Sequence, residues 1–404
     1  MKKNRIFGLP ALLLILGLVL AGCPTDAADG GGAKQEDPQA AQQLAADINA
    51  FEEGDEIATV DDATVTLVGK AVVPSAGNLT VPAGVTLEVT ADGAELTLRD
   101  ATLTVNGTVN AGPERVRLAG DASEATIKGS GTIQLKGTGH LLVVQAVNND
   151  NPNRTLTLEG VTLVGVADNN DPLVVARSGG DGRTGHFIMK SGKITGNTHI
   201  RIGSEENNNW AGAGGVRVNE GGTFTMEDGV ISGNTAKGRR GSGGGGVRVE
   251  QDGTFIMQGG VIYGNTAESD DWSEGGGVGV WRGTFTMEDG VISGNTVKGG
   301  RGGNGGGVDI GEESMFTLKG GTIYGDVYGL PDGADQSLVN IVRSGYAALH
   351  VNDNATAANW GTGGTYTKGG VSQTSGSKIV PFSNNEDDRY DGGTSDTLIA
   401  TPAK

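Results

Sequence analysis

The chain has 404 residues, and its 73 glycines, with only 4% aromatic residues, exclude the composition of ordinary globular domains. So much glycine without a Gly-X-Y period excludes collagen and leaves disorder or a turn-dense repeat, and a hydrophobic content of 36% favours the folded repeat. A formal net charge of −18 makes nucleic acid and anionic membrane surfaces poor partners.

The N-terminus has the features of a secretory signal. Basic residues at positions 2, 3 and 5 precede an apolar run at residues 9–20, which is too short to span a membrane. We therefore predict that residues 1–22 are a signal peptide and that the protein is exported.

A lone cysteine ends this segment. Residues 20–23 read Leu-Ala-Gly-Cys, which resembles the bacterial lipobox, and Cys23 is the only cysteine in the chain. The resemblance implies that Cys23 is lipidated and anchors the protein to a membrane, with residues 23–37 as a flexible tether. We expect a lipoprotein of the cell envelope, with the outer membrane or the cell surface as the favoured location.

Residues 38–54 predict one short amphipathic helix. A proline opens the segment, a glycine at residue 54 stops it, and its apolar residues recur at helical spacing: Ala40, Leu44, Ile48 and Phe51. Such a helix is well placed to cap the open end of the structure that follows.

From Asp61 the hydrophobic period changes to two. Short alternating segments recur about every ten residues and are separated by Gly, Asn and Asp, which predicts strands and turns without intervening helices. A sandwich, a propeller and a β-solenoid all begin in this way, so the spacing of the later repeats decides among them.

The string GTFTMEDGVISGNT occurs at residues 222–235 and again at residues 283–296. It is part of a repeated unit of about 31 residues, in which three short strands are followed by a variable loop. Three strands per turn predict an all-β fold, namely a single-stranded parallel β-helix over residues 55–345 with about ten coils. The preference of parallel crossover connections makes it right-handed. Residues 346–404 are predicted to form a C-terminal cap and a loosely ordered tail.

Each unit carries an asparagine ten residues after its aromatic residue. The four positions are Asn197, Asn234, Asn265 and Asn295. Stacked coils bring such residues about 4.8 Å apart, so these side chains are candidates for a structural amide ladder. The alternative is that they are ordinary turn residues.

The Gly-Gly-Val segment that opens each unit and the Ile-Ser-Gly-Asn of residues 231–234 resemble the repeats of polymorphic outer-membrane proteins. The resemblance covers residues 185–325 and implies a surface-exposed, adhesin-like β-helix. The chain lacks an autotransporter barrel signature at its C-terminus, so the lipid would serve as the anchor.

The loops between the units alternate in charge. AKGRRGSG is basic, AESDDWSE is acidic and VKGGRGGN is basic. If neighbouring loops stack on one edge, weak salt-sensitive attraction between them is expected.

A candidate ligand patch lies on the outward face of the first strand of each unit. Its residues are Arg217, Arg248, Glu250, Trp281 and Asp309, with Trp272 in the preceding loop as a wall. An exposed Trp beside charged groups has the ingredients of a sugar-binding surface. The alternative is that Trp281 only covers the sheet under a neighbouring loop.

These features favour a non-enzymatic binding or adhesion protein with a glycan or a cell-surface component as ligand. The alternatives are a polysaccharide lyase or glycoside hydrolase of the pectate-lyase-like type, because those enzymes resemble this architecture, and a passive surface spacer. No motif predicts a catalytic residue, a cofactor or a metal site.

Overall fold

The computed structural model describes residues 35–51, 56–146, 153–179, 183–202 and 209–323, and several short strands beyond residue 323. Residues 36–404 form one compact unit. The predicted signal peptide, residues 1–22, and Cys23 lie outside the described residues, as does the predicted tether up to residue 34.

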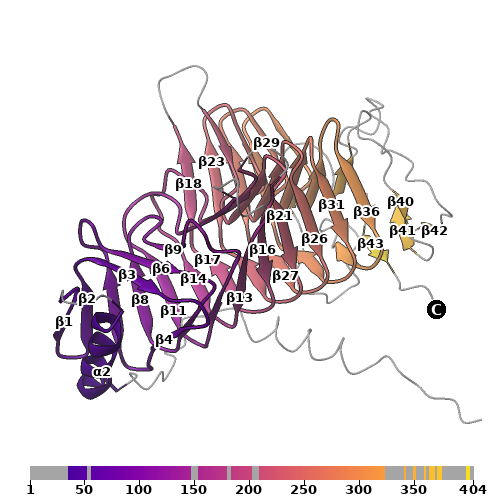
Figure 1. The fold of residues 1–404 in the computed structure, drawn as a ribbon. Helices are drawn as coiled ribbons and strands as arrows, with labels where there is room; N and C mark the ends of the chain where they lie inside the picture. Colours follow the sequence, from indigo (N-terminus) through magenta and orange to yellow (C-terminus); the bar gives the residue numbers. More distant parts are fainter. Residues whose placement is uncertain are drawn as a thin grey trace, which may run out of the picture. The chain divides into compact units, whose positions relative to one another are not determined.

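The described strands form six sheets, numbered here in order of introduction (Figure 1). Sheet 1 runs in the order β1 (Ala58–Asp61), β2 (Thr64–Leu67), β5 (Thr86–Val89), β8 (Thr108–Ala111), β11 (Thr132–Leu135), β14 (Thr162–Val164), β17 (Lys193–Thr195), β22 (Val230–Ser232), β27 (Val261–Tyr263), β32 (Val291–Ser293), β37 (Gly321–Ile323), β43 (Thr397–Ala400), β41 (Gly364–Lys368) and β42 (Val371–Thr374). Sheet 2 runs in the order β4 (Asn78–Val81), β7 (Thr102–Val105), β10 (Glu124–Lys128), β13 (Arg154–Glu159), β16 (Gly185–Met189), β21 (Thr223–Met226), β26 (Thr254–Met257), β31 (Thr284–Met287), β36 (Met315–Leu318) and β40 (Asn359–Trp360).

Two further sheets share the third side of the coils. Sheet 3 contains β3 (Lys70–Val73), β6 (Glu95–Leu98) and β9 (Val116–Leu118). Sheet 4 contains β12 (Leu142–Gln145), β15 (Val174–Arg177), β20 (Val216–Asn219), β25 (Val247–Glu250), β30 (Val278–Trp281), β35 (Val308–Ile310) and β39 (Leu349–Val351). The chain therefore passes from sheet 1 through sheet 3 or 4 to sheet 2 and back to sheet 1. This confirms the predicted all-β class with repeated parallel strands, as in a solenoid.

The remaining two sheets were not predicted. Sheet 5 contains β18 (Thr198–Arg201), β23 (Thr235–Gly238), β28 (Thr266–Ser269), β33 (Thr296–Gly299) and β38 (Ile341–Val342). Sheet 6 contains β19 (Trp210–Gly212), β24 (Gly241–Gly243), β29 (Trp272–Glu274) and β34 (Gly302–Asn304). From β17 onward each complete coil thus has five strands, and the prediction of three strands followed by a variable loop was wrong there. The loops of neighbouring coils are similar in length, so they pair with one another as the main sheets do.

The core is built from like residues stacked in register. Phe224 pairs with Phe255 across sheet 2, and their rings stack with centroids 4.9 Å apart. The same stack includes the earlier and later aromatic residues of the repeat: Phe187, Phe285 and Phe316. All five rings are fully buried. A verbatim sequence repeat therefore corresponds to a structural column, because the parallel register places equivalent residues side by side.

The predicted asparagines lie at the corner between sheets 1 and 5 and form a ladder of buried amides. Asn234 Nδ2 donates to Asn265 Oδ1 at 3.1 Å, and Asn265 Nδ2 donates to Asn295 Oδ1 at 3.0 Å. Asn197 joins through its backbone N–H, which donates to Asn234 Oδ1 at 3.2 Å. Asn169, one coil earlier, extends the ladder by donating to Asn197 Oδ1 at 2.9 Å, although its spacing of 28 residues hides it in the sequence.

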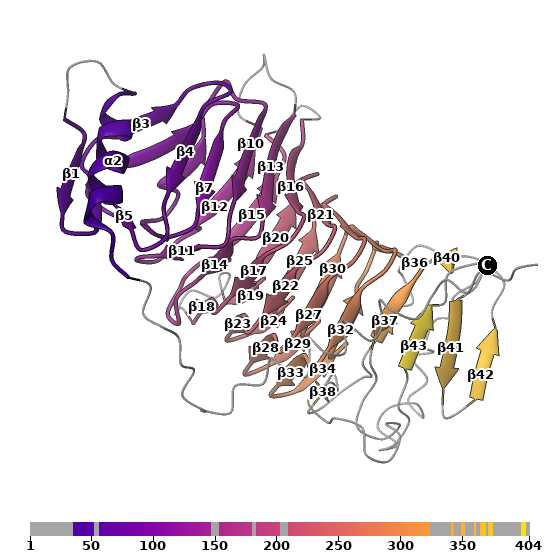
Figure 2. The same ribbon diagram turned by 90° about the horizontal axis from the view of Figure 1, so that it is seen from below.

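Helix α2 (Pro38–Asn49) covers the end of the coils at β1, β2 and β4 (Figure 2). Asp37 caps it by accepting a hydrogen bond from Ala40 N at 2.9 Å, and Pro38 occupies the first turn, where no N–H is needed. The helix buries Ala41, Leu44, Ala45 and Ile48. At the other end of sheet 1, β43 pairs with β37 in the antiparallel direction and is followed by β41 and β42.

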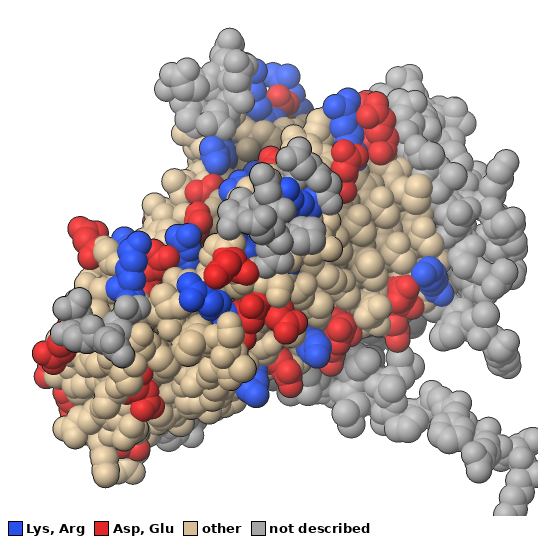
Figure 3. Space-filling view, in the orientation of Figure 1, with Lys and Arg blue, Asp and Glu red and all other residues tan. Residues whose placement is uncertain are grey.

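The loop charges meet on sheet 5. Glu268 lies between Lys237 and Lys298, with ion-pair distances of 2.8 Å and 3.6 Å. All three side chains are about one-third exposed or more, so each pair contributes about 1 kcal/mol or less. Figure 3 likewise shows acidic and basic side chains interleaved rather than gathered in large patches of one sign.

Candidate functional site

A pocket lies in the corner where the outer faces of sheets 4 and 6 meet. Its volume is about 370 Å³, and it is lined by Trp210, Arg248, Glu250, Glu274 and Trp281. These residues come from four different strands, β19, β25, β29 and β30, which belong to three consecutive coils. Residues 244–246 lead the chain directly from sheet 6 into sheet 4, so the two faces stay adjacent from coil to coil.

Arg248 forms the centre of this corner pocket. Its side chain is only 3% exposed, yet it projects between two carboxylates rather than into the apolar core. Its Nε lies 3.6 Å from Glu250 Oε2, and its Nη1 lies 3.4 Å from Glu274 Oε2. The guanidinium also lies 5.8 Å from the ring centroid of Trp210, within cation–π distance. Arg248 Nε is buried and has no hydrogen bond, although it is ion-paired with Glu250.

Glycines on both sheets make room for this arginine. A Cβ placed on Gly279, the next residue of the same column, would lie 2.9 Å from Arg248 Nη1, and a Cβ on Gly243 of sheet 6 would overlap the same atom. Gly279 belongs to the outward column of sheet 4, which reads Arg217, Arg248, Gly279 and Asp309. A side chain at Gly279 would displace the guanidinium of Arg248, which explains why this position is a glycine.

Glu250 joins the pocket to the neighbouring coil. Besides Arg248, it forms a hydrogen-bonded ion pair with Arg217, whose side chain is about one-third exposed. The carboxylate of Glu250 is itself only 10% exposed, so its position is fixed by two arginines. These two ion pairs leave the carboxylate little freedom to move.

Trp281 supplies the aromatic wall on sheet 4. Its indole is partly exposed, and the guanidinium of Arg282 lies 4.5 Å from the ring centroid. Gly311 lies beside the indole in the next coil. A Cβ at this position would contact Trp281 Cδ1 at 3.4 Å, so the glycine leaves that edge of the ring uncovered. Trp281 therefore lines the pocket, as the candidate patch requires.

The structure brings together only part of the predicted patch. Arg248, Glu250 and Trp281 line the pocket, and Arg217 contacts it through Glu250. Trp272 is not a wall of the pocket; its ring lies over Gly302 in the following coil. Asp309 is on the same sheet but is 1% exposed and does not line the pocket.

Two lining residues were missed because they lie in segments read as loops. Trp210 and Glu274 belong to sheet 6, and Trp210 provides the wall that was expected from Trp272. A signal was present in the sequence: the aligned positions of sheet 6 alternate as Trp210, Gly241, Trp272 and Gly302. The spacing of this column is the same as that of the main strands, which indicates strand pairing rather than irregular loops.

The arrangement suits binding of a polyhydroxylated ring better than acid–base catalysis. A sugar presents an apolar face to indoles and a rim of hydroxyls to charged side chains. Both carboxylates of the pocket are ion-paired with Arg248. Among the residues that the structure describes, no three His, Cys, Asp or Glu side chains are grouped to hold a metal ion.

The described residues contain no membrane-spanning helix. Comparisons with protein families, with curated proteins and with solved structures found no match to this chain.

Proposed function

We propose that this protein is a non-enzymatic binding protein that takes a glycan into the corner pocket between sheets 4 and 6. The observation that carries the proposal is a pocket of about 370 Å³ with two tryptophans in its walls and the buried Arg248 between two carboxylates. That volume falls in the range of small-molecule sites and matches one or two sugar rings.

The charges favour a neutral glycan. Arg217 and Arg248 balance Glu250 and Glu274, so a uronic acid would meet as much repulsion as attraction. Hydroxyl groups, in contrast, can accept from Arg248 Nε, which has no hydrogen bond, and donate to the carboxylates. We therefore expect neutral oligosaccharides to bind better than acidic ones.

The protein would act from the cell envelope. The lipobox-like residues 20–23 support lipidation of Cys23, and the resemblance of residues 185–325 to polymorphic outer-membrane protein repeats supports a location on the outer membrane or the cell surface. The parallel sheets support a right-handed β-helix of about ten coils, because connections between parallel strands are right-handed in about 98% of cases.

The test is a binding screen of the full chain against neutral and acidic glycans, followed by titration of the best ligand. Trp281→Ala should weaken binding by at least about tenfold, because truncation of an aromatic side chain that packs against a bound ligand commonly costs more than 1 kcal/mol. Trp272→Ala is the matched control, since it removes the same side chain outside the pocket and should leave affinity within about twofold.

Three outcomes would contradict the proposal. Equal binding by Trp281→Ala and the wild type would reject the pocket. Shortened oligosaccharide products after incubation would favour a lyase or hydrolase. Absence of binding to every glycan would favour a passive surface spacer.

A further inference from the structure

Sheets 3 and 4 form the third side of the coils, and this side is interrupted between β9, the last strand of sheet 3, and β12, the first strand of sheet 4. Strand β9 pairs with β6 and β12 pairs with β15, but β9 and β12 do not pair with each other. Sheets 1 and 2 continue through the same two coils without a break. The connection before β12, residues 136–141, is longer than the corresponding connection before β9, residues 112–115.

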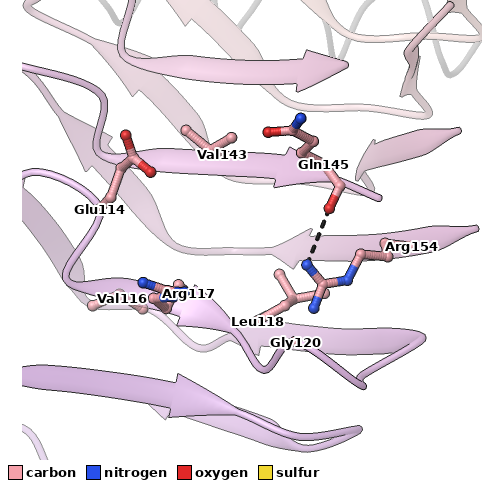
Figure 4. A pocket seen from close by; sticks show the side chains of 8 residues that line it. All are labelled: Glu114, Val116, Arg117, Leu118, Gly120, Val143, Gln145 and Arg154. Atoms are coloured by element: carbon pink, nitrogen blue, oxygen red, sulfur yellow. Dashed lines mark hydrogen bonds between the residues drawn. The ribbon is translucent and has the colours of Figure 1, made fainter. Parts of the chain in front are cut away.

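A second pocket, called here the seam pocket, opens at this interruption (Figure 4). Its volume is about 120 Å³, which corresponds to about four water molecules. The apolar lining consists of Val116, Leu118 and Val143, and the polar lining consists of Glu114, Arg117, Gln145 and Arg154, with Gly120 completing the wall. Figure 4 shows Arg154 reaching toward β12 from one end of the pocket, with Glu114 and Arg117 toward the other end.

One hydrogen-bond donor of Arg154 has no partner at the seam pocket. The residue is only 6% exposed. Its Nε donates to the Ala122 carbonyl and its Nη1 donates to the Gln145 carbonyl, both at 3.0 Å, but its Nη2 has no partner. A buried N–H donor without a partner destabilises the folded state, and an added acceptor would offset that cost.

The charges around Arg154 favour an anion. Burial and the positive charge of Arg117 lower the pKa of Arg154, and the negative charges of Asp121 and Asp100 offset only part of this. Arg117, which also lines the pocket, forms an ion pair with Glu95 at 3.2 Å.

We propose that the seam pocket binds a small monocarboxylate with a short alkyl chain. The carboxylate would accept from Arg154 Nη2 and gain from the charge of Arg117, while the alkyl chain packs on the three apolar residues of the lining. Glu114 in the lining disfavours a doubly charged anion such as phosphate. The small volume excludes a peptide strand.

Isothermal titration of the full chain with butyrate tests the proposal, with butyramide and inorganic phosphate as comparison probes. We expect saturable binding of butyrate, and at least about tenfold weaker binding of the neutral amide, which lacks the charge that Arg154 would meet. Equal binding of phosphate and butyrate would show a general cationic surface and overturn the proposal, as would the absence of butyrate binding.

Two variants keep the test independent of folding defects. Arg117→Gln changes a half-exposed side chain and should weaken butyrate by about threefold. Val143→Phe fills the pocket from β12 without removing any contact of Arg154 and should abolish binding; retained affinity in this variant would also overturn the proposal. Trp281→Ala should leave butyrate binding unchanged, so failure of this site and failure of the glycan pocket are distinguishable.

Discussion

Buried polar side chains in this protein are held by neighbours one coil away. Asn265 is fully buried, but its amide donates to Asn295 Oδ1 at 3.0 Å and to the Ile231 carbonyl at 2.9 Å, so its donors are satisfied. Arg248 is buried to a similar extent, and its Nε has no hydrogen bond. The repeat thus satisfies every donor of the Asn265 amide at one corner and leaves one arginine nitrogen without a hydrogen bond at another.

His199, in the first strand of sheet 5 (β18), is a third buried polar residue. Its Nδ1 donates to the Ala213 carbonyl at 2.9 Å, and its Nε2 accepts from Arg201 Nε at 3.2 Å, which fixes the neutral tautomer. Burial lowers the pKa of His199 from 6.5 to about 4.

Stability should therefore fall as the pH decreases from about 6.5 to about 4. The unfolded chain takes up the proton at the ordinary pKa and the folded chain does not, so the stabilisation is complete above pH 6.5 and is lost toward pH 4. The expected loss is about 3 kcal/mol. Denaturant unfolding of wild type and His199→Gln across this range checks it: the variant should lack this part of the slope, and parallel curves would contradict the assignment.

At the scale of elements, sheets 5 and 6 pack on small residues. The inward residues of sheet 5 are Ala236, Ala267 and Val297, and those of sheet 6 are Ser242, Ser273 and Gly303. Where sheet 5 has the larger Val297, sheet 6 has Gly303, and a Cβ on Gly303 would overlap Val297 Cγ1. The spacing between the two sheets is thus kept constant by compensating volumes.

Because of this compensation, we expect that the free-energy costs of substitutions at positions 297 and 303 do not add. Gly303→Ser should destabilise by about 1–3 kcal/mol, because Val297 is stiff at χ1 and cannot move aside. Val297→Ala alone should cost about 1–2 kcal/mol for the lost methyl groups. The double variant recreates the Ala267–Ser273 pair and should recover most of the loss of Gly303→Ser. A double-mutant cycle from thermal or denaturant unfolding measures this coupling, and strictly additive costs would contradict the packing.

At the scale of the whole solenoid, stability depends on covering the ends of the stack. A terminal coil exposes unpaired strand edges and apolar side chains, which promote association. Helix α2 covers the end at β1, β2 and β4, and Asn49 ties it to the first strand by accepting from Ala58 N at 2.8 Å. The antiparallel strand β43 pairs along the opposite edge of sheet 1.

Disrupting the helix contact should convert the protein into oligomers. Leu44→Asp places a charge on the buried face of α2, whereas Gln42→Asp places the same charge on its exposed face. We expect Leu44→Asp to lower the melting temperature and to give dimers or larger species in light scattering, with Gln42→Asp remaining like wild type. A monomeric Leu44→Asp variant with an unchanged melting temperature would show that the cap is dispensable.

The sequence by itself determined the elements whose signals are local or periodic. The amphipathic pattern of residues 38–54 gave the helix, although it ends at Asn49, and the alternating segments gave the strands of the main sheets. The unit of about 31 residues also placed like residues in common columns, including Arg248, Glu250 and the stacked phenylalanines.

Only the tertiary structure decided how the columns of different sheets meet. The glycine-rich loop segments have little intrinsic preference for strands, and they form sheets 5 and 6 because equivalent segments lie beside them in the next coil. That pairing brings Trp210 and Glu274 against Arg248, while Trp272 lies over Gly302 instead. The repeat period determines which residues share a column. The angle between the sheets and the break at β12 depend instead on contacts between segments that are distant in the sequence, and a local sequence pattern does not contain that information.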